Sequence, residues 1–149
     1  MPRFKYRMQN ILDIKTKLEE QAKNEYAQTQ ARLNSELEKR EELVRRRRGF
    51  EEESRQLRKS ALDIKALAEN QYAIDVVNGY VSEQEKVISR VEKELEKKRE
   101  ELNIAMQERK MYEKLKEKAF EAYLEEEKSS EMKAVDELTS YSYGRNNDN

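Results

Sequence analysis

The chain has 149 residues, of which 42% are charged, and its 31 Lys and Arg nearly balance 32 Asp and Glu. A domain of this length normally buries about two thirds of its unfolded surface, so a mean hydropathy of −1.21 argues against a globular core. The sequence has no His, no Cys and only three separated Gly, which excludes the common catalytic, zinc-binding and phosphate-binding sites. A site built from carboxylates alone would need a pocket, which we do not foresee. We therefore expect no enzyme activity, no metal and no cofactor.

The first predicted helix begins near the N-terminus. Apolar residues recur along it at a spacing nearer 3.6 than 3.5, at Met8, Ile11, Leu18, Ala22, Tyr26, Leu33, Leu37 and Val44. A second row, Leu43, Phe50 and Leu57, then follows at seven-residue intervals. The apolar stripe is therefore predicted to change face between about Leu37 and Phe50, which indicates either a stutter in a coiled coil or a second face for a partner.

The connection between the helices is predicted from a capping pattern. Ser60-Ala61-Leu62-Asp63 has the spacing of a capping box, in which the Ser hydroxyl and the acidic side chain cap the start of a helix. With the apex there, residue i of one arm faces approximately residue 130 minus i of the other. This register places Met8 beside Phe120 and Leu18 beside Tyr112.

The second predicted helix carries the clearest pattern. Steps of three and four residues connect Ile74, Val77, Val81, Gln84, Ile88, Val91, Leu95, Lys98, Leu102, Ala105, Arg109 and Tyr112. Nine of these twelve are apolar, and a narrow stripe that repeats every seven residues is typical of a left-handed supercoil. Because Lys98 and Arg109 fall within the stripe, we expect a loosely packed seam.

These patterns predict an all-α fold, a long antiparallel two-helix coiled-coil hairpin that forms one domain. We predict the domain over residues 1–140, helices over about residues 4–57 and 69–139, a bend at about residues 58–68 and a disordered polar tail over residues 141–149. We expect a monomer, because a hairpin buries its own stripe. The alternative is a structural coiled-coil scaffold that forms a homodimer.

Charge and hydropathy also bound the partners and the location. The basic run Arg45–Arg48 lies close to Glu41, Glu42 and residues 51–53, which favours a neutralised solvated face over a nucleic-acid site. No apolar run approaches the about 20 residues that cross a bilayer, and the first twenty or so residues lack the apolar region of a signal peptide. We expect a cytoplasmic protein with no nucleic-acid partner and no direct membrane insertion.

Apolar residues outside the stripes are candidates for partner contacts. They occur near the open end of the hairpin at Phe4, Tyr6, Met111, Leu115, Phe120 and Leu124, and toward the tip at Leu43, Phe50 and Tyr80. They either close over the edge of the seam or stay exposed for another protein.

Four segments carry a family resemblance. They are residues 4–13 (FKYRMQNILD), 19–23 (EEQAK), 108–118 (ERKMYEKLKEK) and 131–138 (EMKAVDEL). These segments resemble the FliJ family of flagellar export proteins, and the resemblance covers about residues 4–140. It implies a rod-like stalk or chaperone of the flagellar type III export apparatus, located in the cytoplasm, peripherally associated with the membrane export apparatus, and not an enzyme. A stalk of a non-flagellar type III secretion system is the alternative.

The resemblance also implies partners, namely the export ATPase hexamer, the export-gate membrane protein and export chaperones. The gate and chaperone surface, toward the tip, would include Leu43, Phe50, Val77, Tyr80 and Gln84. The ATPase surface, at the open end, would include Met8, Ile11, Met111, Leu115 and Phe120. Arg46 and Ala73 depart from the family pattern, because relatives would have aromatic side chains there, so the gate contact is expected to be weaker or rearranged.

Overall fold

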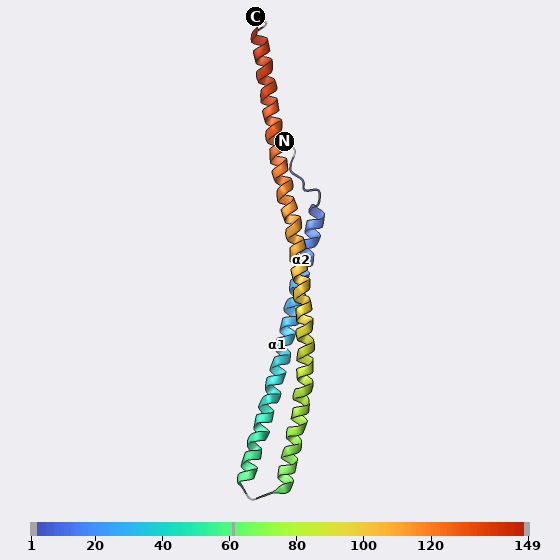
Figure 1. Ribbon diagram of the computed structural model, residues 1–149, viewed down its shortest axis with the longest axis vertical. Helices are drawn as coiled ribbons and strands as arrows, with labels where there is room; N and C mark the ends of the chain where they lie inside the picture. Colours follow the sequence, from blue (N-terminus) through green and yellow to red (C-terminus); the bar gives the residue numbers. More distant parts are fainter. Residues whose placement is uncertain (1–2, 61, 148–149) are drawn as a thin grey trace. The chain divides into compact units, whose positions relative to one another are not determined.

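The structure is a computed structural model that describes residues 3–60 and 62–147, with side chains up to Arg145. Two helices fill most of this range, α1 over Gln9–Lys59 and α2 over Ile64–Asn147 (Figure 1). The single Pro, Pro2, stands before both helices in the sequence, so no Pro interrupts them. The described residues contain no strand, and the predicted all-α antiparallel hairpin is confirmed.

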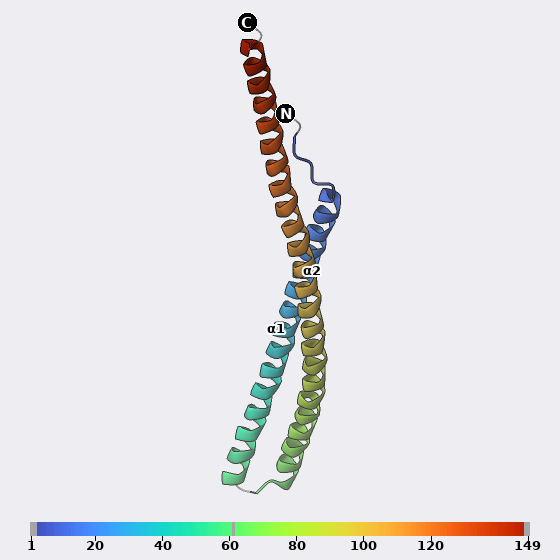
Figure 2. The same cartoon turned by 45° about the horizontal axis from the view of Figure 1, so that its top comes forward.

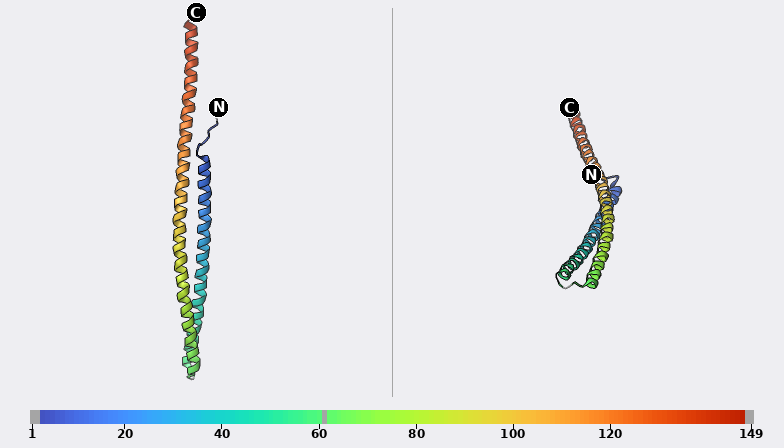
Figure 3. Two further views of the ribbon diagram at one scale, coloured as in Figure 1. Left: turned by 90° about the vertical axis from the view of Figure 1, so that its right-hand side faces the viewer. Right: turned by 60° about the horizontal axis from the view of Figure 1, so that its bottom comes forward.

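Contacts divide the chain into two units, which we describe separately. The bend unit is Gln21–Asn103, and it contains the connection between the helices. The open-end unit is Met1–Glu20 with Ile104–Asn149. Within each unit, a segment of α1 lies beside a segment of α2 and runs in the opposite direction, as views from several sides show (Figures 2 and 3).

The core of the bend unit is a narrow row of aliphatic side chains. Leu33 of α1 packs with Ile88 and Val91 of α2, and Val87 and Leu95 cover this cluster. Val91 is 0% exposed. A core this thin gives each buried side chain a large share of the hydrophobic stabilisation, since few others contribute.

The stripe predicted along α2 is confirmed. All twelve positions from Ile74 to Tyr112 are buried or half-buried, including the charged Lys98 and Arg109. The residues between them on α2 are mostly exposed, as expected for a helix that buries one edge.

The stripe predicted along α1 is wrong in two respects. It does not change face, and four of its predicted members are exposed, namely Met8, Ile11, Leu18 and Leu37. Buried or half-buried residues advance by regular three- and four-residue steps, apart from one exposed position at Arg40. They are Leu12, Lys15, Glu19, Ala22, Tyr26, Thr29, Leu33, Glu36, Leu43, Arg47, Phe50, Ser54 and Leu57. The heptad continues without a stutter, but polar side chains occupy about half of its positions, so a pattern traced through apolar residues alone missed it.

Polar pairs across the seam explain why these side chains are tolerated there. In the bend unit, the Gln84 amide donates to the Glu36 backbone carbonyl at 2.8 Å and to its carboxylate at 2.6 Å. The Asn70 amide donates to the Phe50 carbonyl at 2.9 Å, and Asn70 is buried. Because buried polar groups that lack partners are costly, such pairs favour one register and one relative direction of the helices.

Two further pairs across the seam correct the predicted register. Arg40 pairs with Glu85, and Arg47 bonds to Asn78. The numbers of two facing residues therefore add to about 125 rather than 130. The apex therefore lies nearer Leu62 than residue 65. In the open-end unit, the Phe4 ring packs on Phe120, and the Tyr6 hydroxyl donates to the Tyr112 carbonyl.

The cap of α2 also differs from the predicted one. Asp63, not Ser60, precedes the first turn, and its carboxylate accepts a hydrogen bond from the Ala66 N–H at 3.2 Å. The Ser60 hydroxyl instead donates to the Leu57 carbonyl at the end of α1. Asp63 is thus an N-cap in its own right, and Ala61 of the predicted capping box lies outside the described residues.

The helix bounds differ from those expected at three points. α1 begins at Gln9 rather than near residue 4, and α2 begins at Ile64 rather than near residue 69. α2 also continues to Asn147, so residues 141–147, expected as a disordered tail, extend the helix. The last two residues of that predicted tail lie outside the described residues.

Candidate functional site

Exposed apolar side chains gather in the open-end unit. Those on its paired segments are Met8, Ile11, Ile14, Leu18, Ile104, Met111, Leu115, Phe120 and Leu124, and we call this set the open-end surface. The seam of this unit uses a different row on each helix, including Leu12 of α1 and Tyr112 of α2. Apolar residues therefore flank the seam, where two helices alone leave them uncovered.

An extended N-terminal segment packs on α2 in this unit. The Phe4 ring lies edge-on to Phe120, with centroids 5.2 Å apart, and 5.4 Å from the Tyr123 ring. The Tyr6 hydroxyl donates to the Tyr112 carbonyl at 3.1 Å. Aromatic pairs of this kind add to simple burial, so this segment is held on α2 although it is not helical.

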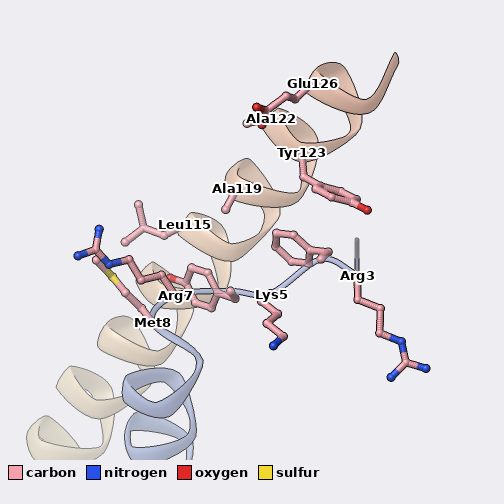
Figure 4. Close-up of a pocket in the computed structure, with 11 residues that line it drawn as sticks. Arg3, Lys5, Arg7, Met8, Leu115, Ala119, Ala122, Tyr123 and Glu126 are labelled. Atoms are coloured by element: carbon pink, nitrogen blue, oxygen red, sulfur yellow. The ribbon is translucent and has the colours of Figure 1, made fainter. Parts of the chain in front are cut away.

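The N-terminal segment and α2 border an open groove of about 640 Å³. In the close-up, Leu115, Ala119 and Tyr123 project from α2 toward the segment, whereas Arg3 and Lys5 point away from α2 (Figure 4). The floor of the groove is thus apolar and its outer edge is basic. Such a groove is wide open, so it suits contact with another protein surface better than enclosure of a small molecule.

Charged pairs join the helices beneath the open-end surface. The Lys15 ammonium lies 2.9 Å from the Glu108 carboxylate, and this hydrogen bond raises the pKa of Lys15. Arg109 binds the carboxylates of Glu19 and Glu113, and the hydrogen bond to Glu19 is the largest cause of its raised pKa. Glu19 is buried. These pairs hold the two helices together where the seam has few apolar contacts, so the apolar residues of this unit lie at the flanks of the seam.

The last part of α2 has no opposing segment among the described residues. Because the numbers of facing residues add to about 125, Arg3 lies opposite the region of residue 122. Every residue from Lys128 to Arg145 is exposed. Met132, Val135, Leu138 and Tyr141 are large exposed apolar side chains there, and we call this set the C-terminal stripe. A single helix of this length is marginal in water, so a covering partner would stabilise it.

The five residues expected to face the ATPase all lie in the open-end unit and are exposed. They are Met8, Ile11, Met111, Leu115 and Phe120. The structure therefore brings them into one unit on both helices. Phe120 also serves the packing of Phe4.

The five residues expected to face the gate all lie in the bend unit, but most point into its seam. Val77 is 6% exposed, and Leu43, Phe50 and Gln84 are half-buried. Tyr80 is 59% exposed. In the closed hairpin, Tyr80 is the member of this set that offers most of its side chain to a partner.

Sequence reasoning missed several members of these surfaces. Ile14 and Ile104 were not distinguished from their neighbours, and the C-terminal stripe was assigned in part to a disordered tail. The predicted register of 130 already leaves the chain after about residue 129 without a facing segment, so the length of the second helix alone indicates that the stripe is unopposed.

The described residues show neither a metal site nor a membrane-spanning stretch. They contain no group of His, Cys, Asp and Glu side chains arranged to hold a metal ion. Neither helix, within its described part, has a stretch long and apolar enough to cross a membrane.

Comparison with known proteins identifies the family. The family model described as "Flagellar FliJ protein" matches residues 4–148. A protein of Bacillus subtilis (strain 168) named "Flagellar FliJ protein" is 24% identical over 136 residues, which are 91% of this chain and 92% of that protein. No solved structure matches the chain. Since the family model spans almost the whole sequence, the chain belongs to the FliJ family of flagellar proteins.

Proposed function

We propose that this protein is a non-catalytic component of flagellar type III protein export. It links the export ATPase ring to the export gate and to export chaperones, and it does so by offering surfaces in turn to these partners. Family membership supports the flagellar assignment. The observation that carries the proposal is the open-end surface, because a row of exposed apolar side chains on both helices is unusual for a protein that works alone.

The open-end surface is the proposed contact with the export ATPase. Met111 and Leu115 lie one turn apart on α2, whereas Met8 directly precedes α1 and Ile11 lies in its first turn. All four are exposed. Residues three or four apart share a helix face, so each pair can enter an apolar patch on the ATPase together.

The C-terminal stripe extends this contact along α2. Met132, Val135 and Leu138 repeat at a three-residue step on one side of the helix, while Lys133, Asp136 and Glu137 lie around them. A partner that covers the stripe would supply the packing that α2 lacks there. Burial of an exposed aliphatic side chain of this size contributes about 1.5–3 kcal/mol.

The bend unit is the proposed contact with the gate and the chaperones. Tyr80 is its accessible member, and Leu43 and Phe50 present only part of their side chains. Val77 and Gln84 hold the two helices together, so they act on this contact by fixing the position of Tyr80. We also propose that the protein is a cytoplasmic monomer, peripherally associated with the export apparatus, without nucleic-acid binding or membrane insertion.

Replacing Tyr80 by Ala is expected to weaken binding to the cytoplasmic part of the export gate, or to an export chaperone, by about tenfold. The substitution removes an exposed ring and creates no cavity, so the helical content measured by circular dichroism should not change. Titration calorimetry with each purified partner measures the effect. Tyr72→Ala is the control, because Tyr72 is an exposed Tyr of the same unit. Unchanged affinity of Tyr80→Ala for both partners would remove Tyr80 from the proposed surface.

A further inference from the structure

A second candidate surface lies on α1 in the bend unit, beside the seam. Six residues line an open groove of about 560 Å³, namely Leu37, Arg40, Glu41, Val44, Arg45 and Arg48. Leu37, Val44 and Arg48 follow at seven- and four-residue steps and therefore lie along one face of the helix. None of the proposed contacts described above uses this face.

The arginines of this groove are only partly neutralised. In the basic run, Arg46 is exposed and pairs with Glu42, which agrees with the expected solvated face, whereas Arg47 lies half-buried in the seam and pairs with Glu51. Arg45 and Arg48 form no ion pair among the described residues, although α1 itself is rich in Glu. Two guanidinium groups therefore remain available beside the groove.

The other charges of the groove leave it basic. Arg40 pairs across the seam with Glu85 at 3.4 Å, so its charge is balanced. Glu41 contributes one negative charge, against the two free arginines. An incoming chain thus meets an apolar strip formed by Leu37 and Val44 with positive charge at its side.

We infer that this groove is a docking site for an acidic amphipathic helix of another protein. The seven-residue interval between Leu37 and Val44 matches the repeat with which a third helix packs against a coiled coil. Carboxylates that flank the apolar row of that helix would pair with Arg45 and Arg48. Nucleic acid fits less well, because phosphates gain nothing from an apolar strip and the chain as a whole has a net charge of −1.

A synthetic helix tests this inference independently of the flagellar assignment. The probe is a fluorescein-labelled peptide of three Glu-Ile-Ala-Ala-Leu-Glu-Glu heptads, and its twin has Lys in place of Glu. Fluorescence anisotropy with the full chain is expected to show binding of the Glu peptide, weaker at higher salt, and no binding of the Lys peptide. Absence of Glu-peptide binding, or equal binding of both peptides, would overturn the inference.

Variants locate the binding to the groove. Arg45→Glu combined with Arg48→Glu is expected to weaken Glu-peptide binding by about tenfold or more, and Leu37→Ser to weaken it by about threefold to tenfold. Arg90→Glu with Lys93→Glu is the control, because these exposed residues of α2 lie in the same unit and undergo the same change of charge. Circular dichroism checks that all variants keep their helices.

The alternative occupants give distinct results. If single-stranded RNA binds in an Arg45- and Arg48-dependent way and displaces the Glu peptide at lower concentration, the groove is a nucleic-acid site and the inference is wrong. If the double Arg variant binds the Glu peptide as tightly as the natural chain does, the peptide binds elsewhere and the inference is likewise wrong. Loss of binding in the groove variants alone supports it.

Discussion

Replacing Met111 and Leu115 together by Asp is expected to abolish measurable binding to the export ATPase, with a loss of affinity of about 100-fold or more. Both side chains are exposed and one turn apart on α2, so two charges would enter the apolar contact while the hairpin itself loses little packing. Surface plasmon resonance with the purified ATPase measures the affinity. Swimming in soft agar measures the consequence in the cell, and cells with this variant are expected to lose motility.

The matched control for this experiment is Asn103→Asp with Gln107→Asp. These exposed residues have the same spacing on α2 and gain the same charge, but they lie outside the open-end surface. The control is expected to bind the ATPase as the natural chain does. If both double variants bind equally well, the open-end surface does not contact the ATPase.

Replacing Val91 by Asp is expected to unfold the bend unit at ambient temperature. Val91 is 0% exposed and packs with Leu33 and Ile88, so a carboxylate there would be buried without a partner. The milder Val91→Ala is expected to reduce the free energy of unfolding by about 2 kcal/mol, from lost transfer energy and a small cavity. Urea denaturation followed by circular dichroism measures both effects.

The control for Val91→Ala uses the same residue type at an exposed site. Val135 is 59% exposed, so Val135→Ala is expected to change the free energy of unfolding by about 0.5 kcal/mol or less. Equal effects of the two substitutions would mean that the row of Leu33, Ile88 and Val91 is not the core of the bend unit.

The seam of α2 could be predicted from the sequence because most of its positions are apolar. From Ile74 to Tyr112, the heptad is regular enough that the charged Lys98 and Arg109 do not hide it. The seam of α1 could not be predicted in the same way. Glu19, Thr29 and Ser54 are buried there. Glu19 is paired with Arg109 across the seam, and such a pair depends on the register, which the sequence of one helix does not show.

The register and the cap show a second limit. A capping box and a simple N-cap both begin with short polar residues, so the sequence does not decide between Ser60 and Asp63 as the cap, and it fixes the apex only to within a few residues. In an antiparallel hairpin, the difference between an apex near residue 65 and one near Leu62 doubles into a shift of about five in the facing residue.

The candidate surfaces were predictable to different degrees for the same reason. The open-end residues Met111 and Leu115 lie off the clear α2 seam, so their exposure follows from the sequence. Leu43 and Phe50 looked like a second row, but they belong to the seam of α1. The sequence does not show their burial, because polar side chains occupy neighbouring positions of the same seam.

Photo-crosslinking in flagellated cells tests most directly the claim that the open-end surface binds the export ATPase. A photoreactive residue is placed at Leu115, and at exposed Lys97 in the bend unit as the reference. The account predicts a crosslinked product with the ATPase from position 115 and none from position 97. No ATPase product from position 115, or an equal yield from position 97, would contradict it.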